Sequence, residues 1–152
     1  MTDRRIRLVV LALLLVTLTL AFASAASAAP DAMAGLRARL TGAQEVPGPG
    51  DPDGGGRAVV RVFPRLQRVC YRLWVSDIDP ATAAHIHVGR PGEAGPVVVP
   101  LNAPTDGYSE GCVEGVDRDL ADALAARPRQ YYVNVHNAAY PAGAVRGQLN
   151  GN

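Results

Sequence analysis

Short segments in which apolar and polar residues alternate, separated by Gly- and Pro-rich turns, restrict this chain to a β-rich fold. The stretches "RAVVRVF" (57–63) and "RVCYRLWV" (68–75) alternate in this way, and a turn at Pro64–Gln67 separates them. Successive side chains of a strand point to opposite faces of a sheet, so the pattern predicts an antiparallel hairpin with one buried face. "YYVNVHN" (131–137) and "AVRGQLN" (144–150) predict a second hairpin around the turn "AAYPAG".

Four other segments carry strand patterns, the last of them weak: "LRARLTGAQ" (36–44), "AAHIHVG" (83–89), "PVVVPL" (96–101) and "YSEGCVEG" (108–115). About eight strands in ~115 residues is the amount that a two-sheet sandwich or a Greek-key barrel requires. The sequence therefore predicts an all-β domain.

One segment has a different period. In "VDRDLADALAARP" (116–128), Val116, Leu120 and Leu124 recur every four residues. Asp117 can cap the start of a helix here and Pro128 ends it, so we expect one short helix within the β fold.

The first 28 residues are typical of a secretory signal peptide. Arg4, Arg5 and Arg7 precede an uninterrupted apolar run, Leu8 to Phe22, and the small-residue triplet Ala26–Ser27–Ala28 follows it. That order of features marks a cleaved export signal. The apolar run has 15 residues, which is short for a membrane span of about 20. We expect an exported protein, secreted or held in the cell envelope, with no stable membrane insertion after cleavage.

The charges of the sequence are close to balanced. Without residues 1–28 the chain keeps 12 basic residues, all of them Arg, against 13 acidic ones, and it has no basic tail or block of like charge. Neither nucleic acid nor an anionic membrane surface is indicated as a partner.

Cys70 and Cys112 are the two cysteines of the chain. In an oxidising compartment an even pair is most simply one disulfide, and two buried thiols are the alternative. A bridge that closes a loop of roughly 40 residues would stabilise the fold by about 3–4 kcal/mol in the chain-entropy view.

Three histidines are the side chains most able to carry chemistry. His85 and His87 lie two residues apart on one predicted strand and share a face; His136 lies on a late strand and shares its face with Tyr132 and Asn134. If the two strands meet, three imidazoles can hold one copper or zinc ion. The competing interpretation is a structural polar cluster in which the histidines, Asn134 and Arg146 fix the pairing of the strands.

The chain resembles members of the chordin-type (CHRD) domain family. The resemblance rests on "LTGAQEVP", "AAHIHVGRPGEAGPVVVPL" and "YYVNVHNAAYPAGAVRGQL", in that order, and predicts one domain over residues 36–150. It implies an extracellular, immunoglobulin-like β-sandwich. Animal chordins add cysteine-rich modules that bind secreted growth factors. This chain has no such modules, so that activity is not carried over.

A more distant similarity is to Cu/Zn superoxide dismutase, in which an H-x-H pair and later histidines hold copper. His85, His87 and His136 supply at most three ligands, so the histidine count excludes the dinuclear enzyme but not a mononuclear site. We therefore expect a non-enzymatic exported binding or structural module without a cofactor, whose partner is an unidentified extracellular protein or envelope component. The alternative is a mononuclear copper or zinc protein, with redox activity as one outcome.

Overall fold

The fold is described by a computed structural model, which covers residues 33–151. Within these residues the strands are β1 (Ala34–Thr41), β2 (Gly55–Phe63), β3 (Arg68–Ser76), β4 (Ala81–Val88), β5 (Val97–Leu101), β6 (Tyr108–Glu114), β7 (Tyr131–Asn137), β8 (Val145–Gln148) and the short β9 (Asn150–Gly151). The helix α2 (Arg118–Ala126) lies between β6 and β7. The 3-10 turns η1 (Gly42–Gln44), η2 (Pro64–Leu66) and η3 (Pro128–Gln130) follow β1, β2 and α2.

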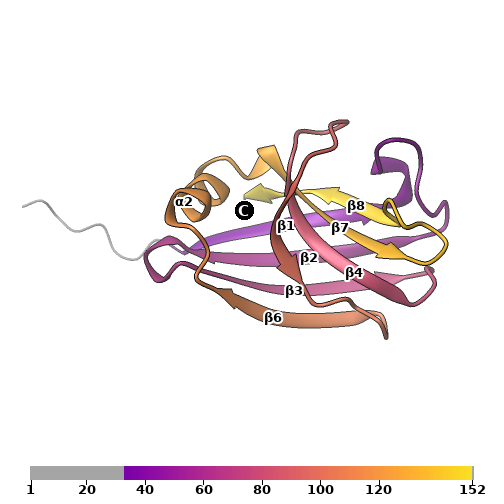
Figure 1. The fold of residues 1–152 in the computed structure, drawn as a ribbon, viewed down its shortest axis with the longest axis horizontal. Coiled ribbons are helices and arrows are strands. Elements are labelled where there is room, and N and C mark those ends of the chain that lie inside the picture. The colour runs from indigo at the N-terminus through magenta and orange to yellow at the C-terminus, as the bar shows by residue number, and fades with distance from the viewer. Residues whose placement is uncertain (1–32, 152) are drawn as a thin grey trace, which may run out of the picture. The chain divides into compact units, whose positions relative to one another are not determined.

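The strands form one antiparallel hydrogen-bonded sheet. Its order is β5-β4-β7-β8-β1-β2-β3-β6, and β9 adds a short pairing to β1. The sheet curls strongly: in Figure 1, β4 and β7 run at an angle to β2 and β3. The two edge strands, β5 and β6, approach each other without pairing. The sheet is thus a nearly closed barrel with an inner apolar face and an outer face.

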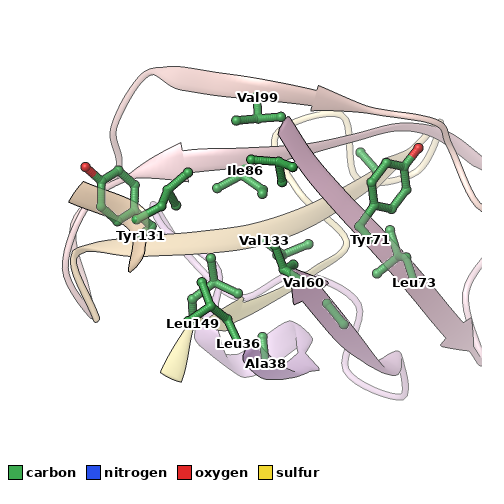
Figure 2. Close-up of a cluster of buried hydrophobic side chains, with 14 of the residues drawn as sticks. Leu36, Ala38, Val60, Tyr71, Leu73, Ile86, Val99, Tyr131, Val133 and Leu149 are labelled. Carbon is green, nitrogen blue, oxygen red and sulfur yellow. The ribbon is translucent and has the colours of Figure 1, made fainter. Parts of the chain in front are cut away.

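The core lies between the two halves of the curled sheet. Leu36, Val60 and Leu73 come from β1, β2 and β3, and Ile86, Val99 and Val133 face them from β4, β5 and β7 (Figure 2). Along β3 every second residue is buried, as the alternation in the sequence predicts. Full burial of such a side chain contributes about 1.5–3 kcal/mol, so the inward stripes of the strands hold the barrel closed.

The helix α2 lies at one end of the strands, close to the η2 turn (Figure 1). The Asp117 carboxylate accepts a hydrogen bond from the Leu120 N–H at 3.0 Å and caps its first turn. Ala121 and Leu124 are fully buried against the core. The four-residue period of the sequence therefore predicted the helix and the buried position of Leu124, whereas Leu120 is only partly buried.

The predicted all-β class with one short helix is confirmed, and both predicted hairpins form, as β2–β3 and β7–β8. The immunoglobulin-like sandwich stays a prediction, because the described strands belong to a single sheet rather than to two. The expected signal peptide, residues 1–28, lies outside the described residues. Among residues 33–151 no helix is long and apolar enough to cross a bilayer.

The predicted disulfide is confirmed. Cys70 on β3 and Cys112 on β6 are directly opposite each other in the antiparallel ladder and are bonded to each other. Their side chains lie on the outer face of the sheet, opposite to the core positions Val69 and Val113. The bridge ties β6, an edge strand, to the centre of its half of the sheet.

Replacing Cys70 and Cys112 together by Ala is expected to lower the free energy of unfolding by about 3–4 kcal/mol, because the unfolded chain regains the entropy of the loop. Urea denaturation of the oxidised wild type and the variant measures the difference. Reducing the wild type should bring its midpoint to that of the variant. A variant within about 0.5 kcal/mol of the oxidised wild type would show that β6 needs no covalent tie.

Candidate functional site

The three histidines project from the outer face of the sheet, where β4 pairs with β7. In this ladder His85 is opposite Asn134, His87 is opposite Tyr132, and Ala83 is opposite His136. Residues two apart on a strand share a face, so His85 and His87 point the same way as His136, away from the buried Ile86. The sequence could not show whether the two histidine strands are neighbours. In the structure β4 pairs with β7, and this pairing brings the three imidazole rings together.

Backbone carbonyl groups orient two of the rings. The Nδ1 of His87 lies 2.8 Å from the Gly95 carbonyl oxygen, and the Nδ1 of His136 lies 3.1 Å from that of Pro141. A carbonyl oxygen only accepts, so in both rings Nδ1 carries the hydrogen and donates it. In a neutral ring the other nitrogen, Nε2, then carries a lone pair. The Nε2 of His87 is buried and has no hydrogen-bond partner in the described residues.

The third ring meets His136 directly. The Nδ1 of His85 lies 3.2 Å from the Nε2 of His136 and donates its hydrogen to that lone pair, and the side-chain amide of Asn134 lies 3.1 Å from the same Nε2. Burial, together with the charges of His136 and His87, lowers the pKa of His85 from its usual 6.5. Burial also lowers the pKa of His136, against the raising effect of its Pro141 hydrogen bond. Both rings are therefore neutral at pH 7, which is the form that binds metal ions.

One nitrogen from each ring can face a common point. These three nitrogen atoms lie within 4.8 Å of one another, and no carboxylate among the described residues joins the group. Two nitrogens bound to the same ion at roughly 2.1 Å lie at most about 4.2 Å apart. The separation of up to 4.8 Å exceeds this limit, so the rings must move closer together to share one ion.

Tyr132 and Arg146 extend the cluster across β7 to β8. The Tyr132 ring stacks on the His87 ring, with centroids 4.8 Å apart and planes within 10°. The guanidinium carbon of Arg146 lies 3.4 Å from the centroid of the Tyr132 ring. An Arg over a tyrosine ring is a favourable cation–π contact, stronger where water is excluded. This stack fixes the plane of the His87 ring.

The loop between β4 and β5, residues 89–96, covers this face of the sheet. The Nη2 of Arg146 donates to the carbonyl oxygens of Arg90 and Glu93, each at 2.9 Å. Gln148 donates to the Gly89 carbonyl at 2.7 Å, and Gly95 N–H donates to the Tyr132 hydroxyl at 3.2 Å. Side chains of β7 and β8 therefore hold the loop that supplies the Gly95 carbonyl to His87.

A second loop brings Glu45 onto the same face. Its carboxylate packs against Gly143 in the β7–β8 turn, where a side chain would collide with it, and Gly143 has a φ of 149°. Glu45 Oε1 and Arg146 Nη1 are both buried without a hydrogen-bond partner among the described residues. Burial raises the pKa of Glu45 from 4.5 to about 7, although the Arg146 charge opposes the shift. Burial likewise lowers the pKa of Arg146.

A family comparison identifies the domain that carries this site. The family model of the CHRD domain matches residues 36–149, nearly the whole described chain. The chain belongs to the CHRD family. No curated protein and no solved structure matches it. Family membership and the disulfide fit an extracellular module.

The CHRD domain brings together the site residues proposed from sequence, but in two groups. His85, His87, His136 and Asn134 are in mutual contact. Arg146 contacts Tyr132 and the 89–96 loop instead. Sequence reasoning placed Tyr132 on the same face without giving it a role, and it did not identify Glu45 or Gln148. The period-two pattern contained the signal for Gln148, which shares a face with Arg146; nothing in the loop sequence singled out Glu45.

The raised pKa of Glu45 predicts a pH-dependent stability. Between pH 4.5 and about 7 the folded CHRD domain keeps a proton that the unfolded chain has lost, so stability falls as the pH rises through this window. Glu45→Gln keeps the shape without the charge, so the variant should gain stability relative to the wild type as the pH rises. Urea midpoints across this range measure the difference. Parallel curves for the two proteins would contradict the assignment.

Proposed function

We propose that this CHRD domain is an exported module that binds one transition-metal ion through His85, His87 and His136. The ligand atoms are Nε2 of His87 and Nε2 of His136, because the other ring nitrogens of these two residues donate to carbonyl groups, and one ring nitrogen of His85 completes the set. Three protein ligands leave one position of a four-coordinate ion open to water or a small ligand. No catalytic step is part of the proposal.

The proposal of a metal site rests on the hydrogen bonding of the His87 ring. A structural polar cluster would satisfy each of its buried polar atoms, since an unpaired buried group costs roughly 1–3 kcal/mol. The Nε2 of His87 is instead buried without a partner while Nδ1 is held at 2.8 Å from Gly95 O. Histidines that bind metals typically donate their second nitrogen to a carbonyl or carboxylate in this way.

Copper is the ion that the donor set favours. All three donors are imidazole nitrogens, which suit copper and zinc alike, and divalent copper binds such a site more tightly than zinc. Zinc is then the competing ion. The histidine–histidine contact at 3.2 Å favours the alternative of a structural polar cluster, and a metal ion must displace this contact.

Metal content separates the two interpretations. Native exported protein is expected to contain close to one copper or zinc ion per chain by mass spectrometry, and His85→Ala/His87→Ala is expected to contain none. Asn134→Ala is the matched control, because it removes a member of the polar cluster and keeps all three imidazoles. Metal-free wild type, together with equal destabilisation of both variants, would establish the structural cluster instead.

Added metal is also expected to stabilise the protein. At a free copper concentration of about 100 times Kd, binding raises the free energy of unfolding by about 2.7 kcal/mol. This gain raises Tm by roughly 10 °C in a domain of this size. A chelator should reverse the shift, and His85→Ala/His87→Ala should show none. Thermal unfolding followed by circular dichroism measures it. An equal shift in the variant would place the binding elsewhere on the chain.

A further inference from the structure

The other half of the sheet leaves its outer face uncovered. On β1 the alternation points Arg37 and Arg39 outward, and on β2 it points Arg57 and Arg61 outward; all four are exposed. Arg37 is directly opposite Val59, and Arg57 and Arg61 are the residues two before and two after Val59 on β2. The four arginines therefore lie around Val59 on the outer face of these two strands, and this surface is called here the arginine face.

These arginines have no carboxylate partner within residues 33–151. The ion pairs on this half lie at its β6 edge, where Arg68 pairs with Glu114 at 2.6 Å and Arg72 with Glu110 at 3.3 Å. None of the four central arginines makes an ion pair with another described residue. The near balance of charge over the chain thus conceals a locally basic surface.

One pairing on this face is unfavourable in the isolated protein. Arg39 is directly opposite Arg57 in the β1–β2 ladder. Like charges at directly opposite positions destabilise an antiparallel pair, since their Cβ atoms lie about 4.5–5.5 Å apart. An anionic ligand lying across the two strands would remove this repulsion.

Aromatic rings continue the same row. Arg57 is opposite Trp74 on β3, and Trp74 is opposite Tyr108 on β6. The guanidinium of Arg57 lies 4.1 Å from the Trp74 ring centroid, and the rings of Trp74 and Tyr108 are 5.3 Å apart. Tyr108 is 43% exposed. Two cations followed by two rings form a strip that crosses four strands.

We propose that the arginine face binds an extended acidic polysaccharide. Sulfate or carboxylate groups suit the planar donor fork of Arg, and the C–H face of a sugar ring packs on an exposed aromatic ring. The disulfide and the family fit an extracellular domain, and such polymers occur outside the cell.

The proposal does not depend on the metal site, which lies on the other half of the sheet. Binding of heparin oligosaccharides and of polygalacturonate to native protein is measured by titration calorimetry, with dextran as the neutral polymer. One or both acidic polymers are expected to bind, and rising salt is expected to weaken the binding. Arg37→Gln/Arg39→Gln is expected to lose about tenfold in affinity, and Arg37→Lys/Arg39→Lys, which keeps the charges without the planar fork, is expected to lose less.

A charge-matched variant controls for net charge. Arg118→Gln/Arg127→Gln removes two exposed arginines at α2, outside the arginine face, and should keep the wild-type affinity. Arg39→Gln alone should weaken binding without lowering Tm, because it relieves the repulsion with Arg57. The proposal is overturned if neither acidic polymer binds, or if Arg37→Gln/Arg39→Gln and Arg118→Gln/Arg127→Gln lose the same affinity. Tighter binding to single-stranded DNA or to anionic lipid vesicles also overturns it.

Discussion

Burial of the Arg146 guanidinium organises the half of the sheet that carries the histidines. A charge that is 1% exposed must be compensated, because desolvation of an unpaired ion costs several kcal/mol. Arg146 meets this requirement with two carbonyl oxygens of the 89–96 loop and with the Tyr132 ring. The same contacts fix the loop over β7 and β8, and so the Gly95 carbonyl that sets the hydrogen position on His87.

Much of this fold could be predicted from local pattern, and the reason is the period of the strands. Alternation in 57–63, 68–75 and 131–137 identified which residues face the core, and the two-residue spacing of His85 and His87 put both rings on one face. Strand order could not be predicted, because pairing of β4 with β7 joins segments about fifty residues apart that carry no mark of each other.

The same limit explains why part of the site was missed. Glu45 lies in a Gly- and Pro-rich loop without any period, and its role depends on how close the loop comes to Gly143. Loop contacts also bury both faces of β7, where Tyr131 to Val135 are all buried. Alternation of apolar and polar residues predicts one buried face and one exposed face, so it cannot show that loops cover the polar face as well.

Residues that point outward are therefore buried by loops on one half of the sheet and exposed to solvent on the other half. On β4, β7 and β8, the outward residues are covered by loops, so their polar atoms must be paired with protein groups or with a ligand. The unpaired Nε2 of His87 therefore points to a ligand. On β1 and β2, the outward residues are exposed to solvent, so an unpaired guanidinium there is not informative by itself. The informative feature is the unfavourable placement of Arg39 opposite Arg57. The two halves share a core but no side chain of either site. Loss of metal binding and loss of polysaccharide binding should therefore be separable by mutation, because each face depends on its own strands and only a collapse of the common core would remove both.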